Sequence, residues 1–131
     1  MKTKILVIED NEQNRYLVTY LLEAKGYEVV SAVDGREGID LANSLQPALI
    51  LLDIQLPGMD GYLVAQALRQ NSTLDDVPIV AVTSYAMVGD RERVLAAGCT
   101  GYIEKPINPD TFMAEVESHL PDYLTPAGGA S

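Results

Sequence analysis

The stretch LILLDIQLPGMDGY, residues 49–62, decides the fold because four aliphatic residues lead directly into an aspartate, Asp53. Continuous aliphatic runs of this kind are typical of strands that are buried on both faces, as in parallel sheets. The Pro-Gly and Asp-Gly pairs that follow, at 57–58 and 60–61, predict a sharp turn into the next element. The pattern therefore predicts a carboxylate at the end of a buried strand.

Similar runs recur along the chain and alternate with segments of helical spacing. In the first of these segments, one apolar stripe is predicted from Tyr16, Leu17, Tyr20, Leu21 and Ala24. The alternation predicts an α/β fold, a parallel sheet with helices on both faces. The predicted strands are 4–8, 28–32, 48–52, 78–82 and 101–104, and the predicted helices are 12–25, 35–45, 62–70, 90–98 and 108–121, the last with an Asn108 cap and Pro109 at its first position.

Length and composition bound the class of protein. A chain of 131 residues predicts one domain, which we place at 1–121, followed by a flexible tail at 122–131. Nine basic against nineteen acidic residues give a net charge of −10, which argues against direct nucleic acid binding. Because no apolar run is long enough to span a bilayer and the first residues do not resemble a signal peptide, we expect no membrane insertion and a cytoplasmic location. The single cysteine, Cys99, excludes an internal disulfide.

Polar side chains follow four of the predicted strands. Glu9 and Asp10 follow the first strand, Asp53 the third, Thr83 the fourth and Lys105 the fifth. In open α/β sheets the functional crevice lies at the carboxyl ends of the strands, so these side chains are expected at one rim. Clustered carboxylates favour a hard cation such as Mg²⁺, and an ammonium and a hydroxyl can bind phosphoryl oxygens. The set predicts phosphoryl transfer to an aspartate.

These residues resemble the receiver domain of two-component response regulators. The resemblance covers residues 4 to about 120 and rests on four motifs in order: VIEDN (7–11), LLDIQLPGMDG (51–61), VTSYAM (82–87) and GYIEKPI (101–107). It implies a doubly wound, five-stranded parallel sheet with five helices, flavodoxin-like in topology, with strand order 2-1-3-4-5. The sequences around the first acidic pair and Thr83 resemble single-domain regulators and receivers attached to hybrid kinases.

The resemblance also implies how the acidic residues act. Asp53 would accept a phosphoryl group from a phosphohistidine on a sensor histidine kinase or phosphotransfer protein. Asp10 would bind Mg²⁺ directly and Glu9 largely through water. Asp53 and the backbone carbonyl of Gln55 would complete the protein's share of the metal site.

The remaining motif residues are implied to bind the phosphoryl group and to transmit its presence. Lys105 would contact the phosphoryl group, with a cis peptide bond before Pro106 aiming it into the pocket. Thr83 and Tyr102 would be the switch residues, and the surface of the fourth helix, fifth strand and fifth helix would meet a downstream protein. Tyr85 is predicted to hinder the water that hydrolyses the phosphorylated state.

Three other functions fit parts of the pattern. A phosphatase of the haloacid dehalogenase type also has a nucleophilic strand-end aspartate, but it needs a second acid two residues later, where this chain has Gln55. A flavin or nucleotide module would need Ser, Thr and Gly in loops that here carry acids. A receiver that is never phosphorylated could act as a docking module. We expect a phosphoacceptor signalling domain and not an enzyme.

Overall fold

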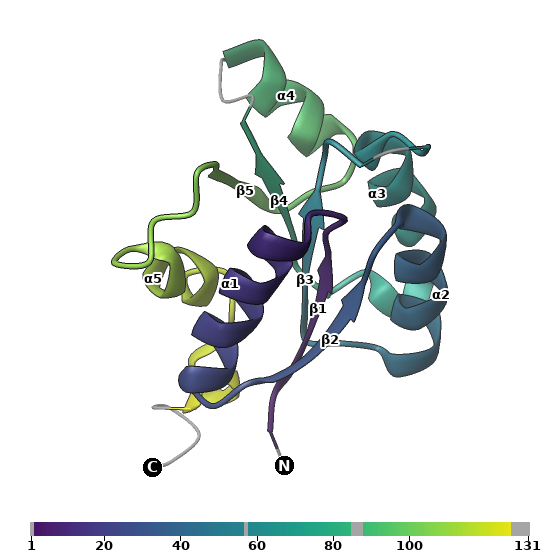
Figure 1. The fold of residues 1–131 in the computed structure, drawn as a ribbon. Helices are drawn as coiled ribbons and strands as arrows, with labels where there is room; N and C mark the ends of the chain where they lie inside the picture. The colour runs from purple at the N-terminus through teal and green to yellow at the C-terminus, as the bar shows by residue number, and fades with distance from the viewer. Residues whose placement is uncertain (1, 57, 85–87, 127–131) are drawn as a thin grey trace.

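The computed structural model describes residues 2–56, 58–84 and 88–126, and it contains one five-stranded parallel sheet in the order β2-β1-β3-β4-β5 (Figure 1). The predicted doubly wound fold with this strand order is therefore confirmed. The strands are β1 (Lys4–Ile8), β2 (Glu28–Ala32), β3 (Leu49–Asp53), β4 (Ile79–Thr83) and β5 (Gly101–Glu104). The third and fourth strands each begin and end one residue later than predicted. Asp53 and Thr83 are therefore the last residues of these strands.

Five α-helices connect and flank the strands. Three of the helices have an N-cap residue of a favoured type. The side chains of Asn11, Asp34 and Asp60 each accept a hydrogen bond from a backbone N–H of the helix that follows. The helices are α1 (Glu12–Ala24), α2 (Gly35–Leu45), α3 (Gly61–Arg69), α4 (Val88–Ala96) and α5 (Phe112–Glu117), with short 3₁₀ turns η1 (Ser72–Leu74) and η2 (Asp122–Leu124).

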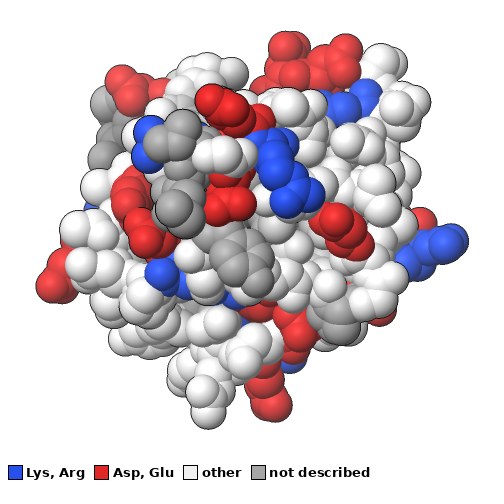
Figure 2. Space-filling view, turned by 90° about the horizontal axis from the view of Figure 1, so that it is seen from above, with Lys and Arg blue, Asp and Glu red and all other residues white. Residues whose placement is uncertain are grey.

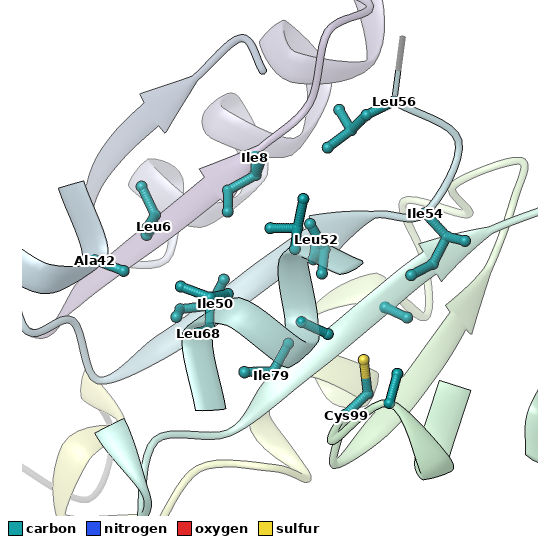
Figure 3. Close-up of a cluster of buried hydrophobic side chains, with 14 of the residues drawn as sticks. Leu6, Ile8, Ala42, Ile50, Leu52, Ile54, Leu56, Leu68, Ile79 and Cys99 are labelled. Carbon is teal, nitrogen blue, oxygen red and sulfur yellow. The ribbon is translucent and has the colours of Figure 1, made fainter. Parts of the chain in front are cut away.

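The strand side chains alternate between two hydrophobic layers. On β1, Leu6 and Ile8 face the layer completed by α2, α3 and α4, whereas Ile5 and Val7 face the layer completed by α1 and α5. Figure 3 shows the first layer, where Leu6, Ile8, Ile50, Leu52, Leu68 and Ile79 gather. The central strands β1, β3 and β4 are buried almost throughout, as their aliphatic runs predict, and the edge strands β2 and β5 are only partly covered.

The apolar stripe predicted for α1 is wrong at its two tyrosines, whereas its Leu21 packs against the core layer of α1 and α5. The side chains buried in this helix are Val18 and Leu22, whereas Tyr16 and Tyr20 are 74% and 61% exposed. The helix has apolar residues on more than one face, and the layer under it accepts branched aliphatic side chains. The tyrosines can stay in water because their hydroxyl groups are solvated there.

The C-terminal region also differs from the prediction. Asn108 does not cap α5, which begins at Phe112; its side chain instead accepts from Asp110 N at 2.9 Å in the preceding turn. Within the predicted tail, η2 packs Leu124 against the core layer of α1 and α5, and the Thr3 hydroxyl donates to the Leu124 carbonyl. Residues 127–131 of that tail, like Pro57 and Tyr85, lie outside the described residues.

The loop from β3 to α3 closes tightly behind Asp53. A side chain at Gly61 would collide with the backbone of Ile54, and Gly61 N donates to Ile54 O at 3.2 Å. Gly58 has φ +76°, a left-handed conformation that favours glycine. These two glycines allow α3 to begin close to the end of β3. Across the described ranges, the helices are too short or too polar to span a membrane.

Candidate functional site

Asp53 lies at the end of β3 and is almost fully buried, with 2% of its surface exposed. Its Oδ1 accepts a hydrogen bond from Gln55 N at 2.9 Å and lies 3.2 Å from Lys105 Nζ. A buried carboxylate is costly unless it is paired and hydrogen-bonded, and both forms of compensation are present. The sequence places the lysine far from Asp53, and the fold joins them because their strands end at the same rim.

Glu9 and Asp10 bring two further carboxylates to Asp53. Carboxylate oxygens of the three residues lie within 4.8 Å of one another, so the predicted acidic cluster is present. Glu9 is buried, while Asp10 is exposed at the mouth of the site. Lys105 Nζ lies 3.4 Å from Glu9 Oε1, and Asn11 N donates to Glu9 Oε2 at 3.2 Å.

The burial of Glu9 changes its acidity. Burial, a hydrogen bond with Asp53 and the charge of Asp53 raise the pKa of Glu9 from 4.5 to about 7, against the lowering effect of Lys105. One ammonium therefore does not fully compensate two buried carboxyl groups. A site with this balance favours either a retained proton or an added cation.

The switch residues predicted from the resemblance occupy the strands on the other side of β3. Thr83 is buried at the end of β4, and its backbone oxygen accepts from Lys105 N at 2.8 Å. Tyr102, on β5 opposite Ala81, is half-buried and packs against the layer of α2, α3 and α4. The peptide bond between Lys105 and Pro106 is cis, as expected.

Two features of the site were not predicted from the sequence. Arg15 Nη1 donates to the carbonyl oxygens of Glu9 at 3.0 Å and Asp10 at 3.3 Å. The side chain of Gln55, considered only for its carbonyl, accepts from Ser84 N at 3.1 Å and so joins the loop after β3 to the loop after β4. These contacts run from side chain to backbone, and residue type alone does not indicate them.

The residues present suit a hard divalent cation. Three carboxylates converge, no cysteine or histidine lies among them, and the partly exposed mouth leaves room for water ligands. Figure 2, which looks onto the ends of the strands, shows acidic side chains spread over this face with basic ones between them. The donor set is that of Mg²⁺ more than that of Zn²⁺.

Comparison with known proteins gives the same family from sequence and from structure. The model of the response regulator receiver domain matches residues 5–117. The polar-differentiation response regulator DivK of Brucella anthropi is 43% identical over 122 residues, which cover 93% of this chain and 99% of that protein.

Solved structures agree in fold. The chemotaxis protein CheY4 of Vibrio cholerae superposes with a TM-score of 0.88 at 31% identity, covering 92% of this chain and all of that one. The receiver domain of the sensor histidine kinase PA1611 from Pseudomonas aeruginosa, solved with a magnesium ion coordinated in its active site cleft, gives 0.82 at 32% identity, over 90% and 97% of the two chains. With Asp53, Lys105 and the acidic pair brought to one rim, the chain belongs to the family of response regulator receiver domains and functions in signalling.

Proposed function

We propose that Asp53 is the phosphoacceptor of this receiver domain and that its partner is a phosphohistidine on a sensor histidine kinase or a phosphotransfer protein. The observation that supports this most strongly is the position of Asp53, a buried carboxylate beside Lys105 at the centre of the acidic cluster. The ammonium lies 3.2 Å from the acceptor and would bind an incoming phosphoryl oxygen.

The proposed step is an in-line transfer. A carboxylate oxygen of Asp53 attacks phosphorus, the P–N bond to the donor imidazole breaks, and the imidazole nitrogen keeps the bonding pair. Lys105 offsets the charge on the transferred oxygens, and the Thr83 hydroxyl donates to one of them. Gln55 N holds Asp53 Oδ1 in place, which preorganises the nucleophile.

The acidic residues are proposed to hold Mg²⁺. Asp10, Asp53 and the Gln55 carbonyl would be direct ligands, and Glu9 would act largely through water. When bound, the metal ion supplies positive charge against the phosphoryl oxygens. The magnesium ion in the cleft of the PA1611 receiver domain supports this assignment.

Output is proposed to run from Thr83 and Tyr102 to the surface of α4, β5 and α5. Drawing the Thr83 hydroxyl toward the phosphoryl group would vacate space beneath α4, and the Tyr102 ring would fill it. A downstream protein that prefers one form of this surface shifts the population by its differential affinity. Because the net charge of the chain is −10, the proposed target is a protein and not nucleic acid. The proposed location is the cytoplasm.

We propose a signalling role and not turnover of free phosphate esters. Gln55 offers no acid at the position where a dehalogenase-type phosphatase needs one. The observation against a passive docking module is that Asp53 and Lys105 are paired inside a complete pocket.

Intact-mass spectrometry after incubation with acetyl phosphate and Mg²⁺ tests the proposal. Wild type should gain one phosphoryl group, Asp53→Asn should gain none, and Asp60→Asn should behave as wild type. Asp60 is the matched control because it is a nearby exposed aspartate that caps α3, a role that asparagine also fills. An unlabelled wild type, or equal labelling of Asp53→Asn, would contradict the assignment.

A further inference from the structure

Arg15 reaches back from the first turns of α1 across the loop that carries two of the three acids. Its Nη1 donates to the carbonyl oxygens of Glu9 at 3.0 Å and Asp10 at 3.3 Å. The same loop is anchored at its start by Glu9 N, which donates to Ala32 O at 3.0 Å. One guanidinium group thus holds two successive carbonyl groups of the acidic loop.

The two carbonyl groups belong to the two peptide units on either side of Asp10. A peptide unit is planar, so fixing the direction of its carbonyl oxygen restricts the whole plane. With both flanking planes restrained, the range of φ and ψ at Asp10 is narrowed, and with it the direction of the Cα–Cβ bond. Arg15 therefore restricts where the Asp10 side chain starts, through the backbone and not through the carboxylate.

Asp10 needs this help more than the other two acids do. Asp53 is held by Gln55 N and Lys105, and Glu9 by Asn11 N and Lys105. The Asp10 carboxylate is exposed, and within 2–56, 58–84 and 88–126 no hydrogen bond or ion pair restrains it. Its backbone is the part of Asp10 that the structure fixes.

We infer that Arg15 is a positioning residue for divalent-cation binding, acting on Asp10 through the two carbonyl groups; the inference rests on the proposed function of the acidic cluster. Removing such an indirect contact to a ligand costs about 10-fold to 100-fold in metal affinity, as for other residues that orient ligands. The lower end applies here because the loop keeps its other anchors.

The positive charge of Arg15 by itself weakens Mg²⁺ binding, whereas its positioning of Asp10 strengthens it. The direction in which the Mg²⁺ affinity changes on substitution therefore tests the inference. A nearby cation repels a divalent ion, so a variant that only loses this charge leaves the site more negative and binds Mg²⁺ more tightly. Loss of positioning instead weakens binding. The direction of the change therefore separates the two roles.

Calorimetric titration of metal-free protein with Mg²⁺ measures this. Arg15→Met, which keeps the apolar stem and removes the donors, should bind about tenfold more weakly than wild type. Arg15→Lys, which keeps a cationic donor, should recover most of the loss. Lys25→Met is the matched control, since it removes the same charge from an exposed position at the end of α1 and should leave affinity as it is.

Equal or tighter binding by Arg15→Met, an equal loss in Lys25→Met, or an equal loss in Arg15→Lys would each overturn the inference. The melting temperature in EDTA checks that Arg15→Met folds; if it does not, Arg15→Gln takes its place with the same expected direction. Asp10→Ala separates this inference from the proposed function. If wild type and Asp10→Ala bind Mg²⁺ alike, the proposed metal site is wrong. If Asp10→Ala binds Mg²⁺ weakly but Arg15→Met binds it like wild type, the metal site stands and only the role of Arg15 is refuted.

Discussion

The guanidinium carbon of Arg91 lies 5.0 Å from the centre of the Tyr102 ring, so α4 rests on the proposed switch residue of β5 through a cation–π contact. A second contact of this kind joins Arg93 to Tyr62 on α3, at 4.2 Å. Among the α4 side chains that the structure describes, Val94 is the buried apolar one. The two arginines therefore add contacts from α4 to Tyr102 and to α3 beside the packing of Val94.

Replacing Arg91 should loosen α4. Arg91→Ala is expected to lower the free energy of unfolding by about 0.5 to 1 kcal/mol, the range for an exposed cation–π contact. Urea denaturation measures the change. Arg36→Ala, an exposed arginine at the start of α2, serves as the control and should stay near wild type; equal losses in the two variants would show that the ring contact contributes nothing.

The pKa of Glu9 gives a pH dependence of defined sign. Its pKa is raised from 4.5 to about 7 in the folded protein, chiefly by burial, so between these values the folded state holds a proton that the unfolded state has released. The contribution of Glu9 to stability is therefore complete below pH 4.5 and is lost as the pH rises through about 7.

Melting temperatures without metal ions, from pH 4.5 to 8, isolate this contribution when wild type is compared with Glu9→Gln. As the pH rises, the melting temperature of wild type should fall relative to that of Glu9→Gln. A constant difference over this range would show that Glu9 titrates with an ordinary pKa.

Lys105 should be most important where both of its partners are ionised. At pH 8 without metal, Lys105→Met is expected to cost about 3 kcal/mol, the lower end for leaving buried charge uncompensated. At pH 5 the loss should be smaller because Glu9 is then protonated. Urea denaturation at the two pH values measures this, and Lys4→Met is the control, since the Lys4–Glu28 pair, 3.6 Å apart, is partly exposed and should contribute little. A loss that does not change with pH would contradict the proposed coupling.

Thr83 should be needed for transmission but not for labelling. With acetyl phosphate and Mg²⁺, wild type is expected to change its hydrogen exchange over α4 and β5, because the displaced hydroxyl group alters the packing beneath α4. Thr83→Ala should be labelled without this change, and Thr83→Ser should retain it. Exchange in Thr83→Ala that follows wild type would exclude the threonine as the switch.

The sequence predicted the sheet well because its strands carry their own signal. The aliphatic runs of β1, β3 and β4 are buried on both faces, so their composition indicates their place directly. The facing side of α1 was not predictable in the same way. Tyr16 and Val18 both suit a helix, and the sheet selects between them only when the two pack together.

The site was also predictable only in part: the residues at the strand ends were predicted, and the side chains that bind loop backbone were not. Asp53 ends β3, Lys105 and the acidic pair directly follow strands, and parallel strands bring their ends to one rim. Arg15 and the side chain of Gln55 act on backbone groups whose positions arise only from the folded loops. The short α5 has the same origin, since the turn at Asn108 uses the side chain that was expected to cap the helix.

The central claim is that the phosphoryl group resides on Asp53, and borohydride reduction of the phosphorylated protein tests it most directly. Borohydride reduces an acyl phosphate to an alcohol, so a phosphorylated aspartate becomes homoserine. The position of the homoserine therefore identifies the acceptor. The tryptic peptide 37–69 contains Asp40, Asp53 and Asp60, so fragmentation in the mass spectrometer distinguishes the acceptor from its neighbours. The account predicts homoserine at position 53 alone; homoserine at Asp40 or Asp60, or an unmodified peptide from labelled protein, would contradict it.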